Sequence, residues 1–330
     1  MKPVKLGIIG CGIAAKKLHW PALQKLKDKF EITVVCNHTA PKAKEFAKLV
    51  GGVPYVQDYR ELLQNPDVEA VDIILPIHLN YQVTRDVLQA GKHTIVEKPL
   101  GANLTEAKKM LTFEDQYPVV KMVAENFRYR STFKRVKEYL NDGRIGEPYA
   151  IFWNIFYHIN QSNPYAQTKW RINHQYPGGF VTDGGVHNIA AIRELFGEII
   201  SGNAFTKTIN PGLGEIDGMS FQFATRHNVH GVFNVFFSAN GYSENKIIIT
   251  GKQGSIVVEH NTIIIKKIGE NDIEESVEDD GGYAGQFEDF YKAIRTGKKV
   301  VSTFSKAYGD LEVIINALNS AKNGRGFSLK

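Results

Sequence analysis

Four apolar stretches alternate with stretches of helical character in the first third of the chain, and this alternation most constrains the fold. The apolar stretches cover residues 5–9, 31–36, 71–75 and 94–97, with helices expected near residues 14–27, 41–49 and 81–90. Strands separated by helices pair in parallel, and strands this apolar are covered on both faces. Residues 53–56, confined to an edge by a proline, and residues 119–124 extend the sheet. The sequence therefore predicts an α/β fold that begins with a doubly wound parallel sheet.

Longer strands separated by glycine or asparagine turns follow after about residue 124. They are expected over residues 150–157, 218–224, 229–237, 246–250 and 255–259, with helices near residues 186–196, 286–294 and 305–321. This pattern predicts an α+β domain in which helices cover one face of a mostly antiparallel open sheet. The acidic residues 270–280 are interpreted as a surface loop. A chain of 330 residues has room for two domains, which we place at residues 1–124 and 125–330.

Composition argues against several classes of protein. Lysine and arginine are scattered among acidic residues and the net charge is +5, so nucleic-acid binding is not expected. No apolar run approaches the roughly 20 residues that cross a bilayer. The N-terminus shows no cleavable signal pattern, so we expect a cytoplasmic protein without membrane contact. Cys11 and Cys36 are too few for a disulfide framework and are interpreted as reduced packing residues.

A glycine turn with Gly10 and Gly12 closes the first strand and opens a helix at Ile13, Ala14 and Ala15. Gly10 permits a tight turn, Gly12 lets the backbone approach a pyrophosphate, and the small Ala15 lets helix and strand pack closely. Between a strand and a helix, this pattern predicts a Rossmann domain whose residues from Gly10 to Ala14 contact a dinucleotide. A merely structural glycine turn is the alternative.

The second strand ends at Asn37, where such a domain reads the adenosine ribose. An NAD enzyme usually places Asp or Glu at this position to accept hydrogen bonds from the 2′-hydroxyl. Asn37 is neutral, and His38, Thr39 and Lys42 could accommodate a 2′-phosphate, so NADP is favoured over NAD as the cofactor. The alternative is that these residues only form the loop.

Glu97, Lys98 and Pro99 end the strand at residues 94–97. Lys98 thereby places an ammonium group at the carboxyl edge of the sheet, where open α/β folds bind their ligands. Taken alone, Glu97 and Lys98 are better explained as solvated edge charges, since most charged side chains are exposed.

Asp183 and His187 lie four residues apart among glycines, so on a helix their side chains share one face. Hydride transfer between a hydroxyl carbon and nicotinamide needs a group that removes or returns the hydroxyl proton, and His187 suits this role near neutral pH. Lys98 would stabilise the developing alkoxide, and Asp183 would orient Lys98 or a substrate hydroxyl. In the alternative interpretation, Thr182 or Asp183 caps a helix and His187 packs in its first turn.

Together these motifs resemble the Gfo/Idh/MocA family of oxidoreductases, named for glucose-fructose oxidoreductase and inositol dehydrogenase. The similarity runs along the whole chain and rests on residues 10–15, 76–78, 90–93, 97–99, 170–171 and 178–187. Glu97-Lys98-Pro99 is the most specific of these motifs and the glycine turn the least. The resemblance implies a dinucleotide-binding domain at residues 1–124 and a substrate-binding domain at residues 125–330, whose sheet supports a homodimer or homotetramer.

The resemblance also implies roles for individual residues. Lys98 matches the family's active-site lysine, and Asp183 and His187 match its carboxylate and acid/base positions. Cofactor contacts are implied for Pro76, His78, Glu97, Lys98, Trp170 and Arg171, and substrate contacts for Lys98, Asn126, Asp183 and His187. A cis peptide bond is expected between Lys98 and Pro99. Asn80 stands where many members carry a histidine, and Asn126 is as readily explained as the start of a helix.

We therefore predict an NAD(P)-dependent dehydrogenase or reductase, with NADP favoured, that acts on a CH–OH group of a sugar, polyol or related cyclic compound. A glycosidase that uses a tightly bound nicotinamide cofactor transiently and a non-catalytic sensor of dinucleotide and sugar are the alternatives. No metal is expected, because Asp183 and His187 lack further ligands. The other histidines, His19 among them, occur singly and are interpreted as packing or surface residues.

Overall fold

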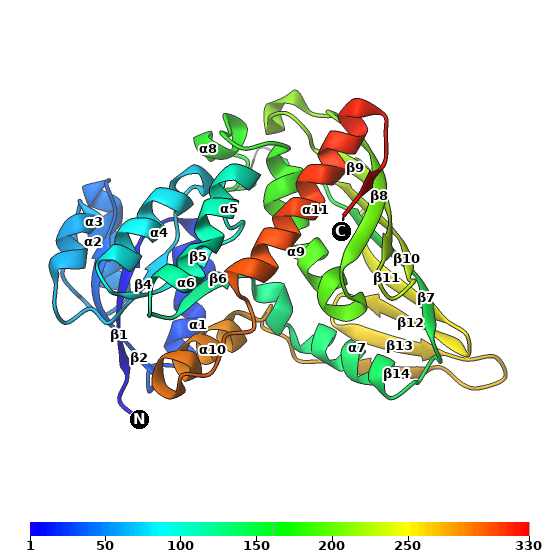
Figure 1. The fold of residues 1–330 in the computed structure, drawn as a ribbon, viewed down its shortest axis with the longest axis horizontal. Helices are drawn as coiled ribbons and strands as arrows, with labels where there is room; N and C mark the ends of the chain where they lie inside the picture. The colour runs from blue at the N-terminus through cyan, green and yellow to red at the C-terminus, as the bar shows by residue number, and fades with distance from the viewer. Residues whose placement is uncertain (161, 330) are drawn as a thin grey trace. The chain divides into compact units, whose positions relative to one another are not determined.

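The computed structural model describes residues 1–160 and 162–329 and divides into two compact units (Figure 1). The first unit comprises residues 1–126 and 283–309, and the second comprises residues 127–282 and 310–330. The predicted division into residues 1–124 and 125–330 therefore needs a correction, because residues 283–309 return to the first unit.

The first unit contains a six-stranded sheet in the order β3-β2-β1-β4-β5-β6. The strands are β1 (Val4–Ile9), β2 (Phe30–Cys36), β3 (Tyr55–Val56), β4 (Ala70–Ile73), β5 (His93–Glu97) and β6 (Lys121–Ala124). All the recorded pairings in this sheet are parallel, which confirms the predicted Rossmann sheet. The strand order reverses between β1 and β4, and ligands of such folds bind at the carboxyl ends of the strands beside this point.

Helices connect these strands. They are α1 (Trp20–Lys25), α2 (Ala40–Leu49), α3 (Tyr59–Gln64), α4 (Asn80–Gln89), α5 (Leu104–Leu111) and α6 (Phe113–Gln116), with the short 3₁₀ helices η2 (Ile77–Leu79) and η3 (Asn126–Tyr129). The predicted helix at residues 14–27 is divided, because a π-helical turn, η1 (Ala15–His19), precedes α1. Such turns are rare and occur frequently at functional sites.

The returning segment completes the core of the first unit. It contains α10 (Tyr283–Thr296) and the first residues of α11 (Phe304–Asn323). α10 lies beside α1 (Figure 1), and the ring of its fully buried Phe287 packs edge-on against Phe30 of β2, with centroids 5.8 Å apart. Tyr291 contacts the same ring at the same distance. Without α10 this apolar face would be open to water, so the helix is part of the first core.

The second unit contains a nine-stranded sheet in the order β14-β13-β12-β11-β7-β10-β9-β8-β15. The strands are β7 (Pro148–Phe156), β8 (Ile199–Lys207), β9 (Gly218–Thr225), β10 (His230–Phe236), β11 (Glu244–Gly251), β12 (Gly254–Glu259), β13 (Thr262–Lys266), β14 (Ile273–Ser276) and β15 (Phe327–Ser328). β7 and β10 pair in parallel and the other recorded pairs are antiparallel, which confirms the mostly antiparallel sheet.

β14 lies within the acidic residues 270–280, so the interpretation of that whole stretch as a loop is wrong. Ile273 pairs with Ile265 of β13. The negative charge of Glu275 is matched by Arg135, whose Nε lies 3.0 Å from the carboxylate. Opposite charge on a neighbouring helix thus allows an acidic segment to join the sheet edge.

Helices cover one face of the nine-stranded sheet. They are α7 (Ser131–Asn141), α9 (Gly179–Phe196) and the remainder of α11. The short α8 (Lys169–Ile172) and η4 (Pro211–Leu213) contact each other. α11 lies along α9 (Figure 1): a Cβ atom at Gly185 would be 3.1 Å from Ile314 of α11 and 3.7 Å from Phe233 of β10. Gly185 therefore lets α9 pack closely against both neighbours. None of the described helices is apolar over a length that would cross a membrane.

The opposite face of this sheet carries exposed aromatic side chains. In β7, Phe152 is 44% exposed while its neighbours Ile151 and Trp153 are buried, because successive residues of a strand point to opposite faces. In β8, Phe205 is 75% exposed beside the buried Ala204. The sheet thus has one face in the core and one partly apolar face at the surface.

Replacement of Phe287 tests whether α10 belongs to the first core. We expect Phe287→Ala to lower the free energy of unfolding by about 3–5 kcal/mol, because it leaves a cavity between α10 and the sheet. Ile268→Ala is the control, since Ile268 is fully exposed, and its effect should stay within about 0.5 kcal/mol. Urea denaturation followed by circular dichroism measures both. Equal effects of the two substitutions would contradict this assignment.

Candidate active site

The glycine turn at the carboxyl end of β1 has the shape that a dinucleotide requires. Gly10 has a φ of 106°, and a Cβ atom there would lie 2.0 Å from the carbonyl oxygen of Ile74. Only glycine fits this approach. At Gly12, by contrast, a Cβ atom would meet none of the described atoms within 4 Å. The backbone at Gly12 is therefore open to a ligand, and the turn fits the pyrophosphate of a dinucleotide.

Asn37, at the end of β2, is bound to this turn. Its Oδ1 accepts a hydrogen bond from the backbone N–H of Cys11 (3.2 Å), and its Nδ2 donates to the carbonyl of Thr39 (3.3 Å). Its side chain therefore links the ends of β1 and β2, a contact that the sequence did not reveal. Cys11 and Cys36 are buried free thiols, as expected of packing residues, and burial raises the pKa of each to about 12.

Lys98 directly follows β5, and Asn80 fixes the backbone on both sides of it. Asn80 is fully buried, and its Nδ2 donates to the carbonyl oxygens of Glu97 (2.8 Å) and Pro99 (3.0 Å). The peptide bond between Lys98 and Pro99 is cis, which confirms the expectation. Asn80, where the family resemblance would place a histidine, thus has a structural role, since its amide holds the backbone on both sides of Lys98.

Pro76 and His78 lie at the next strand end, after β4. Pro76 precedes η2, and His78 lies within it. The buried Nδ1 atom of His78 has no hydrogen-bond partner among the described residues. Both residues share the carboxyl edge of the first sheet with Lys98 and the glycine turn, as the predicted cofactor contacts require.

His19 does not match its interpretation as an ordinary packing or surface residue. It is fully buried at the end of η1, with its two ring nitrogens each 2.8 Å from a carboxylate oxygen, one on Asp72 and the other on Glu97. These partners are 53 and 78 residues away in the sequence, so no local pattern could have indicated them.

In the second unit, Asp183 and His187 both lie in α9, four residues apart. The helix begins at Gly179 and its N-cap is Gly178, with a φ of 80°. Asp183 is therefore inside the helix, so neither it nor Thr182 is the N-cap. The Thr182 hydroxyl donates instead to the carbonyl of Pro177 (2.6 Å). The N-cap interpretation is wrong because the left-handed glycine starts the helix one turn earlier than the polar residues suggested.

Arg171 of α8 forms an ion pair with Asp183. The distance from Arg171 Nε to Asp183 Oδ2 is 2.7 Å, and the guanidinium lies 4.0 Å from the centroid of the Trp170 ring. The buried hydroxyl of Tyr176 has no hydrogen-bond partner among the described residues, and burial together with the charge of Asp183 raises the pKa of this phenol. Trp170 and Arg171, predicted as cofactor contacts, thus lie beside Asp183, which is predicted to contact the substrate.

The His187 ring stacks on Phe127, with centroids 4.8 Å apart and planes 22° apart. Phe127 belongs to η3, which begins at Asn126, a side chain only 3% exposed. Asn126 does begin a short helix, and its expected contact with substrate stays a prediction. The stacking fixes the plane of the imidazole, and no local sequence pattern predicts it.

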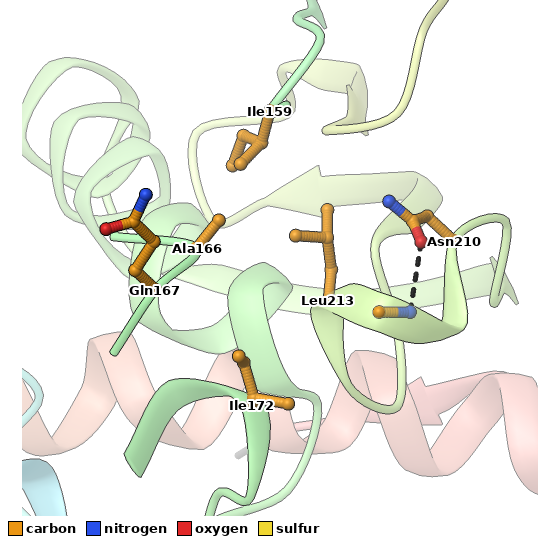
Figure 2. Close-up of a pocket in the computed structure, with 7 residues that line it drawn as sticks. Ile159, Ala166, Gln167, Ile172, Asn210 and Leu213 are labelled. Carbon is orange, nitrogen blue, oxygen red and sulfur yellow. Dashed lines mark hydrogen bonds between the residues drawn. The ribbon is translucent and has the colours of Figure 1, made fainter. Parts of the chain in front are cut away.

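A cavity of about 360 Å³ lies in the second unit beside α8 (Figure 2). Figure 2 shows Ile159, Ala166 and Leu213 around the space, with the amides of Gln167 and Asn210 at its sides. Its volume is in the range of sites for small organic molecules. The cavity adjoins the segment that carries Arg171, because Ile172 is part of its lining. Within the described part of the chain, no group of three His, Cys, Asp or Glu side chains is placed to hold a metal.

Comparison with known proteins agrees with this geometry. A family model described as "Oxidoreductase family, NAD-binding Rossmann fold" matches residues 4–125, and one for the GFO/IDH/MocA C-terminal domain matches residues 133–257. The protein YMR315W of Saccharomyces cerevisiae is 32% identical, with 98% of both chains covered. The scyllo-inositol 2-dehydrogenase (NADP⁺) of Bacillus subtilis is 22% identical, with 99% of this chain and 96% of the relative covered.

A solved structure supports the same assignment over the full length. The crystal structure of an oxidoreductase from Thermotoga maritima superposes with a TM-score of 0.93 and 35% sequence identity, covering 99% of this chain and 98% of the other. Together with the glycine turn, the Glu97-Lys98-Pro99 segment and the Asp183–His187 pair, these matches show that the chain belongs to the Gfo/Idh/MocA family of NAD(P)-binding oxidoreductases.

Proposed function

We propose that this protein is a dehydrogenase or reductase that transfers hydride between a nicotinamide cofactor and a CH–OH carbon of a sugar, polyol or related cyclic compound. The observation that carries the proposal is the Lys98 segment, which Asn80 holds at the carboxyl edge of a dinucleotide-type sheet. The relative that acts on scyllo-inositol, a cyclic polyol, supports this substrate class.

The cofactor would be held by the turn from Gly10 to Ala14, by the loop at Asn37 and His38, and by Pro76, His78, Glu97 and Lys98. When bound, it supplies the acceptor or donor of hydride. The open backbone at Gly12 supports its placement on the glycine turn. We also propose that Trp170 and Arg171 contact the cofactor.

Lys98 has the charge needed beside the oxygen of the reacting carbon. In the oxidation direction His187 takes the hydroxyl proton as the C–H hydrogen leaves with its electron pair, and in reduction it returns that proton. The ammonium of Lys98 stabilises the negative charge that builds on the oxygen. Asp183 accepts a hydrogen bond from a substrate hydroxyl while Arg171 fixes its carboxylate. Asn126 is proposed as a further substrate contact.

Lys98→Met tests the central role of this lysine. We expect kcat to fall by about 10³-fold, because the substitution keeps the length of the side chain and removes the charge that stabilises the alkoxide. Lys108→Met on α5 is the matched control, since Lys108 is exposed and should leave turnover unchanged. Absorbance at the nicotinamide band with a panel of aldoses, polyols and cyclic polyols measures turnover. A folded Lys98→Met protein that retains most of its activity would refute the assignment.

We further propose that NADP is preferred over NAD. Asn37 is neutral and is already committed to the backbone at Cys11 and Thr39, so it provides no carboxylate for a 2′-hydroxyl. Lys42, in the first turn of α2, is exposed and close in sequence to His38 and Thr39. Its ammonium and the loop could pair with a 2′-phosphate.

Binding titrations with both cofactors test this preference. We expect a lower Kd for NADP than for NAD, and Lys42→Met should raise the Kd for NADP by about tenfold while leaving that for NAD unchanged. Lys48→Met, at the other end of the same helix, is the control. NAD bound at least as tightly as NADP would contradict the preference.

The exposed aromatic face of the nine-stranded sheet supports a proposal of a homodimer or homotetramer. Surface patches of this kind commonly lie in subunit contacts. We expect sedimentation equilibrium to give a mass of two or four chains, and Phe152→Lys to lower it, because the lysine introduces a charge into the apolar face. Lys252→Met, at an exposed surface turn, should leave the mass unchanged. A wild-type protein that sediments as a monomer would contradict this proposal.

A further inference from the structure

Three titratable side chains form a continuous chain of hydrogen bonds inside the first unit. His19 Nδ1 lies 2.8 Å from Asp72 Oδ2, and His19 Nε2 lies 2.8 Å from Glu97 Oε1. The side chains of His19 and Asp72 are wholly buried, and that of Glu97 is 14% exposed. This Asp72–His19–Glu97 triad joins η1 to the neighbouring strands β4 and β5.

With both carboxylates ionised, His19 is an imidazolium ion. A carboxylate can only accept hydrogen bonds, so each ring nitrogen must carry a proton to donate to its carboxylate. Burial alone would lower the pKa of His19, but the charges and hydrogen bonds of Asp72 and Glu97 outweigh it and raise the pKa to about 10. Burial raises the pKa of Asp72, and the charge of His19 and its hydrogen bond oppose this rise. From α10, Phe287 and the titratable Tyr283 pack against the ring, with centroids 5.4 and 6.3 Å away.

A buried triad of this kind adds little to the stability of a fold. Each buried ion loses several kcal/mol of hydration, and apolar residues of similar volume often stabilise a core as well or better. Its position is also unusual, because His19 ends the π-helical turn that follows the glycine turn. Both observations point to a role at the ligand site.

The triad is directly connected to the Lys98 segment through Glu97. Glu97 is the last residue of β5 and precedes Lys98, whose flanking carbonyls are held by Asn80. Asn80 therefore fixes the backbone of this segment, and His19 fixes the Glu97 side chain. Because part of Glu97 is exposed at the carboxyl edge of the sheet, a ligand there can reach its carboxylate.

We propose that His19, supported by Asp72, is a positioning residue for the cofactor: it holds the Glu97 carboxylate in place to accept a hydrogen bond from a ribose hydroxyl. This inference rests on the proposed function, since it requires a dinucleotide at this edge. His19 itself acts through Glu97 and contacts neither substrate nor cofactor.

Asp72→Asn tests the proposal, because it keeps the shape of the side chain and removes its charge. In the wild type, His19 stays protonated between about pH 6 and about pH 9, so its hold on Glu97 is constant. In the variant, burial remains while a carboxylate is lost, so the pKa of His19 falls. As the pH rises through this window His19 loses its proton, Glu97 is released, and the cofactor Kd rises.

The quantity to compare is the ratio of variant to wild-type Kd, measured by NADP and NAD titration at each pH. Other groups that titrate in this range change the Kd of both proteins alike, so their effect does not enter the ratio. We expect this ratio to rise about tenfold from pH 6 to pH 9 for Asp72→Asn. His19→Gln is the second variant, which lacks the titrating group, and its ratio should be raised equally at both pH values. A purely structural role would produce no such difference in pH dependence.

Leu62→Ala is the matched control for lost stability. Leu62 is buried in the same unit, outside the triad, so its truncation should lower the unfolding free energy and leave the cofactor Kd unchanged. Ratios near one at all pH values in folded Asp72→Asn or His19→Gln would overturn the role of His19 alone. Failure of the wild type to bind either cofactor would overturn the proposed function and this inference together.

Discussion

The close approach of Gly10 to the end of β4 is the constraint on which the cofactor edge depends. The carbonyl oxygen of Ile74 occupies the space that a Cβ atom at position 10 would need, so only glycine fits at this position after β1. This contact lies at the point where the strand order reverses, so the tight turn and the ligand crevice are parts of one arrangement. Asn37 then ties the end of β2 to the same turn through Cys11.

Buried polar side chains continue this organisation to the neighbouring strands. The amide nitrogen of Asn80 donates to two carbonyls, those of Glu97 at the end of β5 and of Pro99 just beyond it. His19 joins β4 and β5 through their carboxylates. In the second unit, Arg171 and Phe127 play comparable parts for Asp183 and His187. The candidate catalytic groups are thus held by polar and aromatic contacts from residues distant in sequence, which is how a rigid site is built.

The sequence was sufficient for those features that depend on local pattern. The strands of the Rossmann sheet, the mostly antiparallel second sheet and the cis bond after Lys98 agree with expectation, because periodicity and a specific motif encode them. Other features were out of reach. The start of α9 at Gly179 depends on which glycine takes the left-handed conformation, and the Arg171–Asp183 pair and the partners of His19 depend on contacts between separate elements. An isolated histidine carries no local sign of the carboxylates that the fold brings to it.

The return of residues 283–309 to the first unit has a consequence for how this protein is made. The cofactor-binding unit is discontinuous in the chain, so the apolar surface around Phe30 emerges from the ribosome long before Phe287 and Tyr291 are available to cover it. The first unit therefore cannot reach its native core during synthesis until almost the whole chain exists. For the same reason, an exchange of cofactor domains between relatives at a single crossover would separate the apolar surface around Phe30 from the residues of α10 that cover it.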